Sequence, residues 1–355
     1  MLDRRDLLTG GAALGVGLIA GQAKATSLFP RFHACARAAD GSYSVHRHGT
    51  DGWRVPLPAR GHDCVLRPGP KPDLAVFARR PGWFLLIIDP DSGTVRQHLH
   101  PPPGRHLFGH GVYTADGALL LTTENAYETG AGVIGVWDAT GPYRRVGEFP
   151  SGGNGPHDIA LHPDGAHVIV ANGGIRTHPD QPRIKLNLAT MAPNLAVMAL
   201  ATGQIVSKVI PPDGLTQASI RHLSVRADGL IALAMQWEGP ADITVPLLAL
   251  SDGTDYRLLA GPWPAFDHYI GSVAFAGDGR RLAATSSRGG VIGVFDLAGS
   301  TPPALISRTD ISGIDAHGTG FLATDGLGIG WQVDGANATL SSTAPLAWDN
   351  HLIAL

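Results

Sequence analysis

The segment GPHDIALHPDG, residues 155–165, places a histidine before a short apolar run that ends in an Asp-Gly turn. Similar segments recur roughly every fifty residues, a period typical of β-propellers. They are FHACARAADG (32–41), GHDCVLRPG (61–69), GHGVYTADG (109–117), PHDIALHPDG (156–165), RHLSVRADG (221–229), GSVAFAGDG (271–279) and SGIDAHGTG (312–320). Seven such leading segments predict seven blades.

Each leading segment is followed by three further apolar runs, which alternate with loops and Gly- or Asp-rich turns, as in GVIGVWD (132–138). Four short strands joined in this way form one antiparallel blade. The first repeat has only three such runs before residue 60, so we expect the C-terminal AWDNHLIAL (347–355) to complete the first blade. Closing the ring would leave no exposed end blade. The sequence therefore predicts an all-β, seven-bladed propeller of four-stranded antiparallel blades.

The N-terminus has the features of an export signal. Arg4 and Arg5 precede a Gly-rich, weakly apolar stretch that ends in Ala23-Lys24-Ala25. This arrangement predicts a twin-arginine signal peptide over residues 1–25 and a single periplasmic propeller domain over 26–355. The alternative is an N-terminal membrane anchor, which is disfavoured because the apolar run over 7–20 is short for a bilayer. We therefore expect no stable membrane insertion.

Composition and motifs exclude several classes of protein. The hydrophobic content of 44% suffices for a core, and the 27 basic and 30 acidic residues are scattered, which argues against a nucleic-acid partner. After the signal there is no nucleophile elbow, phosphate loop, zinc-protease helix or dinucleotide fingerprint. The two cysteines, Cys35 and Cys64, each follow a histidine by two places. They could form one disulfide or remain two buried thiols.

Four consecutive blades begin with a histidine: His62, His110, His157 and His222, and His33 takes the matching place in the first blade. Because the first strand of a blade runs beside the central channel, we expect these imidazoles to converge at the channel mouth. Converging neutral histidines predict a site for a metal ion, iron or copper, with Glu124 as an additional carboxylate ligand. The alternative is structural, since a buried histidine can also bond to the backbone of a neighbouring blade.

The longer loops are expected on the same face as these histidines. They cover residues 78–82, 123–132, 172–194, 236–242 and 286–290. Binding groups often lie on long loops held by a rigid scaffold. The candidate ligand-binding residues are Arg80, His106, Asn125, Asn172, Arg176, His178, Arg183 and Gln236. Arg176, Arg183 and Lys185 could clamp a small anionic ligand through charge-assisted hydrogen bonds, or they could form a solvated loop surface.

Several of these segments together resemble one bacterial family of exported propellers, the domain of unknown function 1513. The matching stretches include PARGHD (58–63), GRHLFGHGVYTADG (104–117), GPHDIALHPDG (155–165), VANGGIRTHPD (170–180) and SIRHLSVRADG (219–229). The most distinctive positions are His62, His106, His110, His157, Arg176, His178 and His222. The resemblance implies a seven-bladed propeller with a periplasmic link to iron acquisition and an imelysin-like partner protein. It implies no particular reaction.

Three functions are compatible with these features. The favoured one is a non-enzymatic periplasmic protein that binds iron or copper through the channel histidines. The second is a lactonase-like hydrolase of an anionic small molecule, in which Glu124 and a histidine polarise water. The third is a scaffold that binds a protein partner. The fold alone does not separate them, because propellers host all three functions.

Overall fold

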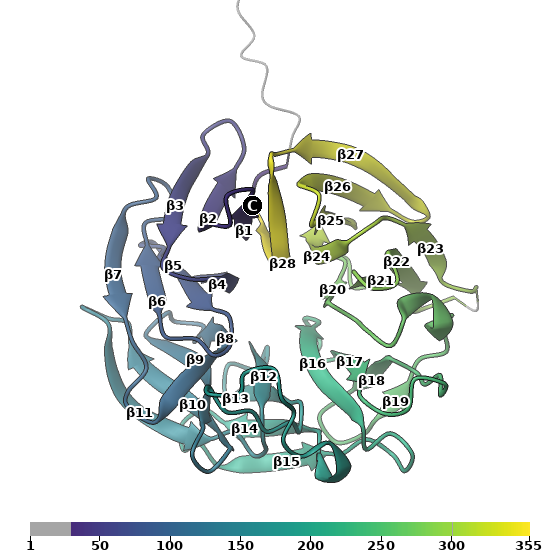
Figure 1. The fold of residues 1–355 in the computed structure, drawn as a ribbon, viewed down its shortest axis with the longest axis horizontal. Coiled ribbons are helices and arrows are strands. Elements are labelled where there is room, and N and C mark those ends of the chain that lie inside the picture. The colour runs from purple at the N-terminus through teal and green to yellow at the C-terminus, as the bar shows by residue number, and fades with distance from the viewer. Residues whose placement is uncertain (1–29, 300) are drawn as a thin grey trace, which may run out of the picture.

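The computed structural model describes residues 30–299 and 301–355, and the expected export signal over 1–25 lies outside the described residues. In this part of the chain, 28 strands form seven four-stranded antiparallel sheets arranged around a central axis (Figure 1). The predicted all-β, seven-bladed propeller is confirmed. Among the described residues, no helix has the length and apolar character needed to cross a membrane.

The strands occupy four positions from the axis outward. The inner strands are β28 (Leu346–Ala354), β4 (Gly61–Leu66), β8 (Arg105–Tyr113), β12 (Pro156–Leu161), β16 (Ala218–Val225), β20 (Ser272–Phe275) and β24 (Ile311–His317). The second strands are β1 (Phe32–Ala38), β5 (Leu74–Ala78), β9 (Leu119–Ala126), β13 (His167–Asn172), β17 (Ile231–Trp237), β21 (Arg281–Ser286) and β25 (Gly320–Asp325).

The third strands are β2 (Tyr43–His48), β6 (Leu85–Ile88), β10 (Ala131–Asp138), β14 (Asn194–Ala199), β18 (Leu248–Ser251), β22 (Val291–Asp296) and β26 (Ile329–Asp334). The outer strands are β3 (Trp53–Leu57), β7 (Val95–Leu99), β11 (Arg144–Pro150), β15 (Ile205–Val209), β19 (Arg257–Leu258), β23 (Ala304–Ser307) and β27 (Asn337–Thr343). Two short 3-10 helices, η1 (Leu188–Thr190) and η2 (Trp263–Phe266), lie in connecting loops.

The C-terminal strand β28 closes the ring by pairing antiparallel with β1. It takes the inner position of the first blade and contacts the inner strands of both neighbouring blades, β24 and β4. Its Trp348 is buried and packs edge-on against Phe32, with the ring centroids 5.0 Å apart. The predicted closure is therefore confirmed. Because β28 is innermost, β1 becomes the second strand of its blade, one strand away from the channel.

In the four blades that begin with β8, β12, β16 and β20, an Asp-Gly pair makes the turn between the inner and second strands. In the repeat that opens with GPHD, Gly165 has φ 68°, a left-handed conformation that glycine adopts without steric cost. The Ala166 N–H donates to the Asp164 carboxylate over 2.8 Å. This is an Asx turn, for which aspartate is suited because its short side chain reaches the backbone two residues on. The pair is thus explained by turn geometry alone.

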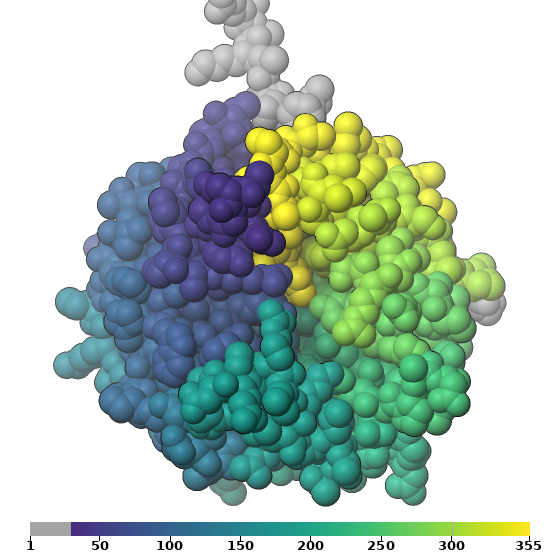
Figure 2. Space-filling model, in the orientation of Figure 1, coloured from purple at the N-terminus to yellow at the C-terminus, as the bar shows by residue number. Residues whose placement is uncertain are grey.

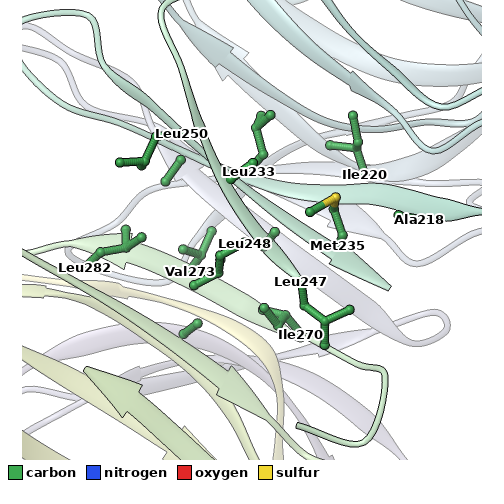
Figure 3. Close-up of a cluster of buried hydrophobic side chains, with 14 of the residues drawn as sticks. Ala218, Ile220, Leu233, Met235, Leu247, Leu248, Leu250, Ile270, Val273 and Leu282 are labelled. Carbon is green, nitrogen blue, oxygen red and sulfur yellow. The ribbon is translucent and has the colours of Figure 1, made fainter. Parts of the chain in front are cut away.

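The core lies within and between the blades. The central strands are buried on both faces, as in β5 and β6, so their sequences are continuous apolar runs. Outer strands such as β11 are largely exposed. One hydrophobic cluster joins the blade of β16–β19 to the blade of β20–β23, where Leu233 and Leu248 share a core with Val273 and Leu282 (Figure 3). Such packing holds the inner strands rigidly around the axis.

His33, on β1, does not reach the channel, so the expectation that it lines the channel mouth is wrong. It is buried within the first blade, where its ring packs against Trp53 with the centroids 5.2 Å apart. Burial lowers the pKa of His33 to about 4, and burial likewise lowers the pKa of His46 on β2 to about 4. Both imidazoles are therefore neutral in the folded protein at neutral pH.

This burial makes stability depend on pH. Between about pH 4 and 6.5 the unfolded chain protonates these histidines and the folded chain does not, so acidification favours unfolding. We expect the free energy of unfolding to fall by up to about 1.4 kcal/mol per pH unit for each fully buried imidazole across this window. Chemical denaturation of the metal-free protein at several pH values measures the slope. His33→Gln should make the slope shallower, and an unchanged slope would contradict this account of His33.

Candidate metal centre

Five histidines meet on the propeller axis, one from each of five inner strands. They are His62 on β4, His110 on β8, His157 on β12, His222 on β16 and His351 on β28. Their ring centroids lie 4.7 Å apart between His157 and His222, 4.7 Å between His222 and His351, and 4.9 Å between His62 and His110. The predicted convergence of His62, His110, His157 and His222 is confirmed. His351 joins them through the closing strand.

A local irregularity of the strands aims these side chains inward. Each histidine lies at or beside a shift in the pairing between the inner and second strands of its blade. In β12, Pro156 pairs with Asn172 and Asp158 pairs with Ala171, so His157 has no partner across the ladder. A β-bulge of this kind redirects a side chain out of the regular alternation. The repeated bulge therefore explains why the blade-leading histidines point toward the axis.

Buried or partly buried carboxylates hold two of the imidazoles in place. His110 Nδ1 donates to Asp63 over 3.0 Å and lies 3.4 Å from Asp158. His62 Nδ1 donates to Asp349 over 3.3 Å. A carboxylate on one ring nitrogen fixes the orientation of the ring and directs the other nitrogen toward a ligand, as in carboxylate–histidine–metal sites. The arrangement leaves Nε2 as the coordinating atom of both His110 and His62.

Four of the five histidines keep a buried ring nitrogen without a hydrogen-bond partner among the described residues. These atoms are His110 Nε2, His157 Nδ1, His222 Nδ1 and His351 Nε2. Their side chains are at most 9% exposed. An unsatisfied buried polar atom costs about 1–3 kcal/mol, so four together point to a missing partner. A metal ion would satisfy them, since imidazole nitrogens are common metal ligands.

The histidines form two groups of candidate ligands that share one residue. Two groups of candidate ligands have their donor atoms within 4.8 Å of one another: His62, His110 and His351, and His110, His157 and His222. Both groups include His110, whose Nδ1 is engaged by carboxylates. Its remaining nitrogen, Nε2, carries one lone pair and binds one ion at a time. The two groups are thus alternative or overlapping parts of a single centre.

The protonation states of the histidines also suit a metal ion. Burial, followed by the neighbouring imidazoles, lowers the pKa of His62, His157 and His222 well below the usual range and that of His351 to about 4. Burial opposes charge on His110 too, but Asp158 and Asp63 reverse this effect and raise its pKa. Neutral imidazole is the form that coordinates metals. A set of imidazole donors suits zinc, copper, iron or nickel rather than calcium or magnesium.

The centre opens into a cavity of about 210 Å³ on one face of the ring. His62, His157 and His222 line it together with residues of four of the five longer loops. In the space-filling view, the teal part of the chain, which includes the longest loop, reaches toward the centre of the ring (Figure 2). The prediction that the histidines share a face with these loops is confirmed. The loop over 123–132 does not contribute to the lining of this cavity.

Three of the candidate ligand-binding residues, Arg80, Arg183 and Gln236, line this cavity. Arg79 and Lys185 from the same loops also line it.

The other candidate ligand-binding residues lie elsewhere, in local networks. Asn125 donates to the carbonyl of Thr177 over 3.0 Å and lies 3.1 Å from His106 Nε2. His178 packs edge-on against a tyrosine ring. Asn172 donates to the backbone carbonyl of Ser151 and to the side chain of Asn194. Arg176 donates to the carbonyl of Thr129 over 2.9 Å. These contacts stabilise loops and blade edges, and they do not bring the residues to the cavity.

Glu124 lies inside the third blade and belongs to neither histidine group. Its carboxylate accepts hydrogen bonds of 2.6 Å from Thr122 and from Arg145, which is on the outer strand of that blade. It is fully buried there, and burial raises its pKa despite the arginine. The structure therefore corrects the expectation that Glu124 joins the histidines as a ligand. Its role in the fold is to bridge strands β9 and β11.

Several residues of the site were not predicted from the sequence, among them His351, Arg221 and Arg288. His351 was not assigned to the axis because its strand follows the last repeat, although it stands in the segment expected to close the ring. Arg221, which lines the cavity and is 5% exposed, directly precedes His222. The position of Arg221 beside a blade-leading histidine was the sequence feature that could have placed it at the site. Cys35 and Cys64 are both buried free thiols in the core between the first two blades.

Comparison with known proteins supports the fold and places the chain in a family. A solved chain of hydrazine synthase from Kuenenia stuttgartiensis has a TM-score of 0.59 at 14% identity, covering 94% of this chain and 99% of that one. At this identity the likeness concerns the fold alone. No curated protein matches the sequence. The family model described as "Protein of unknown function (DUF1513)" matches residues 55–355. The chain therefore belongs to the DUF1513 family.

Proposed function

We propose that this protein binds one transition-metal ion, iron or copper, at the five-histidine centre, and that it does so in the periplasm without catalysing a reaction. The observation that carries the proposal is the set of buried imidazole nitrogens without hydrogen-bond partners. The inner strands hold the histidines in two groups of three that share His110, and within each group the donor atoms lie within 4.8 Å of one another. Preorganised ligands bind an ion without the cost of ordering the chain.

The surroundings of the centre suit a cation. Four of the five imidazoles have lowered pKa values and are neutral, and negative charge comes from Asp63, Asp158 and Asp349 behind His110 and His62. Such outer carboxylates raise the basicity of the coordinating nitrogen. Imidazole donors are compatible with both iron and copper. The expected export signal supports the periplasmic location, and the family resemblance supports a link to iron uptake with an imelysin-like partner.

The structure gives no comparable support to a hydrolase that uses Glu124 as a base. The Glu124 carboxylate is held by Thr122 and Arg145 and faces the outer strands of its blade. A general base must come within about 3.2 Å of the proton that it removes, directly or through one water. Metal binding is therefore the function that the site supports best.

Metal analysis of the protein purified without a polyhistidine tag tests the proposal. We expect close to one iron or copper ion per chain in protein exported to the periplasm of its native host, and restoration of that ratio after chelation and reloading. Protein that is metal-free, and that shows no micromolar affinity for any first-row divalent ion, would refute the proposal.

Removing the metal is expected to lower stability. An ion that binds the folded state alone stabilises it by about 2.7 kcal/mol when its free concentration is 100 times the dissociation constant. Thermal unfolding of chelated and reloaded protein should therefore differ by several degrees, and the shift should grow with metal concentration. Equal melting temperatures at saturating metal would contradict binding to the folded state.

A further inference from the structure

The mouth of the metal centre carries a strong positive charge. Six cationic side chains line the cavity, against one carboxylate, that of Glu238. The cations are Arg79, Arg80, Arg183, Lys185, Arg221 and Arg288. Glu238 is already paired with Lys185 and lies 3.4 Å from Arg221. Within the described residues, Arg79, Arg80 and Arg183 have no ion-pair partner. The mouth therefore holds several cations that no protein carboxylate neutralises.

Arg221 is built into the wall of the cavity. It is 5% exposed, and its Nε has no hydrogen-bond partner among the described residues. Its place in the β16 bulge sets it beside His222, one of the candidate metal ligands. A buried guanidinium nitrogen without a partner is costly, and guanidinium prefers planar anions such as carboxylate or phosphate. The wall thus presents an unused donor next to the metal position.

Arg80 lies close to other cationic side chains of the cavity. Burial, together with the nearby guanidinium groups of Arg221 and Arg79, lowers the pKa of Arg80 to about 9. The side chain remains a cation at neutral pH, but holding it close to other cations costs free energy. A bound anion would offset that repulsion, because attraction between opposite charges is strong in a partly desolvated pocket.

The size of the cavity limits the ligand. A cavity of about 210 Å³ has room for several water molecules. Phosphate, carbonate or a small carboxylate such as oxalate therefore fits. Because His62, His157 and His222 line the same cavity, an anion there can contact the arginines and an ion on the histidines together.

The positive charge of the cavity also affects how the metal ion reaches the histidines. A hydrated cation that approaches through this mouth meets net repulsion, whereas an anion is attracted. We infer that the cavity binds a small oxyanion or carboxylate that coordinates the histidine-bound metal, so that metal and anion are held together. This inference rests on the proposed function, because the anion completes the coordination of the same ion.

Cobalt(II) titration with and without anions tests the coupling, because its visible bands report the ligands around the ion. Metal-free protein in a chloride-free, non-coordinating buffer is titrated alone and then with phosphate, bicarbonate or oxalate, with free Co²⁺ corrected for solution complexes. We expect at least one anion to tighten Co²⁺ binding by about tenfold or more and to change the visible spectrum. By linkage, Co²⁺ should tighten binding of that anion by the same factor.

Charge variants make the test specific. Arg80→Gln should weaken the effect of the anion and should strengthen anion-free Co²⁺ binding, because it removes a repulsive charge. Arg176→Gln, on the loop over 172–194 that also carries Arg183 and Lys185 but outside the cavity, should behave like the unchanged protein. If Co²⁺ binds equally well with and without all three anions, the inference is overturned and the metal-binding proposal stands. If Co²⁺ does not bind under any of these conditions, both are overturned.

Discussion

His110→Ala is expected to abolish metal binding, with an affinity loss of about 100-fold or more. Replacing an outer partner of a metal ligand typically costs 10–100-fold, and His110 is a ligand common to both groups. Its Nε2 is the coordinating atom that the carboxylates of Asp63 and Asp158 direct toward the axis. Isothermal titration of the chelated variant with a first-row divalent ion measures the loss.

Two further variants separate loss of a ligand from loss of the fold. His110→Ala leaves two partly buried aspartates, Asp63 and Asp158, without their imidazole partner, which could destabilise the chain. His351→Ala removes an imidazole whose Nε2 has no hydrogen bond to lose, so the fold should persist while metal affinity falls. His33→Ala is the matched control, since His33 is an equally buried histidine that lies off the axis. Unchanged affinity in both His110→Ala and His351→Ala would contradict the proposed centre.

Deleting residues 346–355 is expected to prevent formation of a stable fold. The deletion removes the whole of β28, which is the inner strand of the first blade and pairs with β1. Trp348 and Leu352 leave the core, β1 becomes an open edge on the axis, and the ring is no longer closed. Loss of Trp348 alone costs about 3–5 kcal/mol, and the total stability of a domain is about 5–15 kcal/mol. The variant should show no cooperative thermal transition by circular dichroism.

Two point variants of the same region provide a comparison for the deletion of residues 346–355. Trp348→Ala should fold with a clearly reduced melting temperature because it leaves a large cavity beside Phe32. Leu340→Ala, on the outer strand β27 and 61% exposed, should change stability by no more than about 0.5 kcal/mol. A truncated chain that unfolds cooperatively at the temperature of the full-length protein would show that β28 is not needed for closure.

The fold could be predicted because each repeat carries its own local signals. The Asp-Gly turns, the apolar runs and the count of seven leading segments depend on nearby residues, and the structure reproduces them. The order of the strands within the first blade was not predicted, although the closing strand was. A short first repeat shows that one strand is missing, but the order of strands within that blade depends on pairing between residues more than 300 positions apart, such as Phe32 with Ala354.

The same long-range pairing explains the errors at the metal centre. His33 has the local sequence of an inner-strand histidine, but β28 displaces its strand outward and supplies His351 instead. Glu124 follows an apolar run in a suitable loop position, yet the pleat of β9 turns its side chain toward Arg145. The repeat of leading segments along the sequence identifies the blade to which a residue belongs. The direction of its side chain depends on bulges and register, which one sequence does not reveal.

Anomalous diffraction from crystals of the metal-loaded protein, with data collected on both sides of the metal absorption edge, tests the central claim most directly. We expect one strong peak on the propeller axis, about 2 Å from His110 Nε2, with at least two more nitrogens from His62, His157, His222 and His351 around it. A channel without any peak, or a peak only at surface histidines such as His98 and His100, would contradict it.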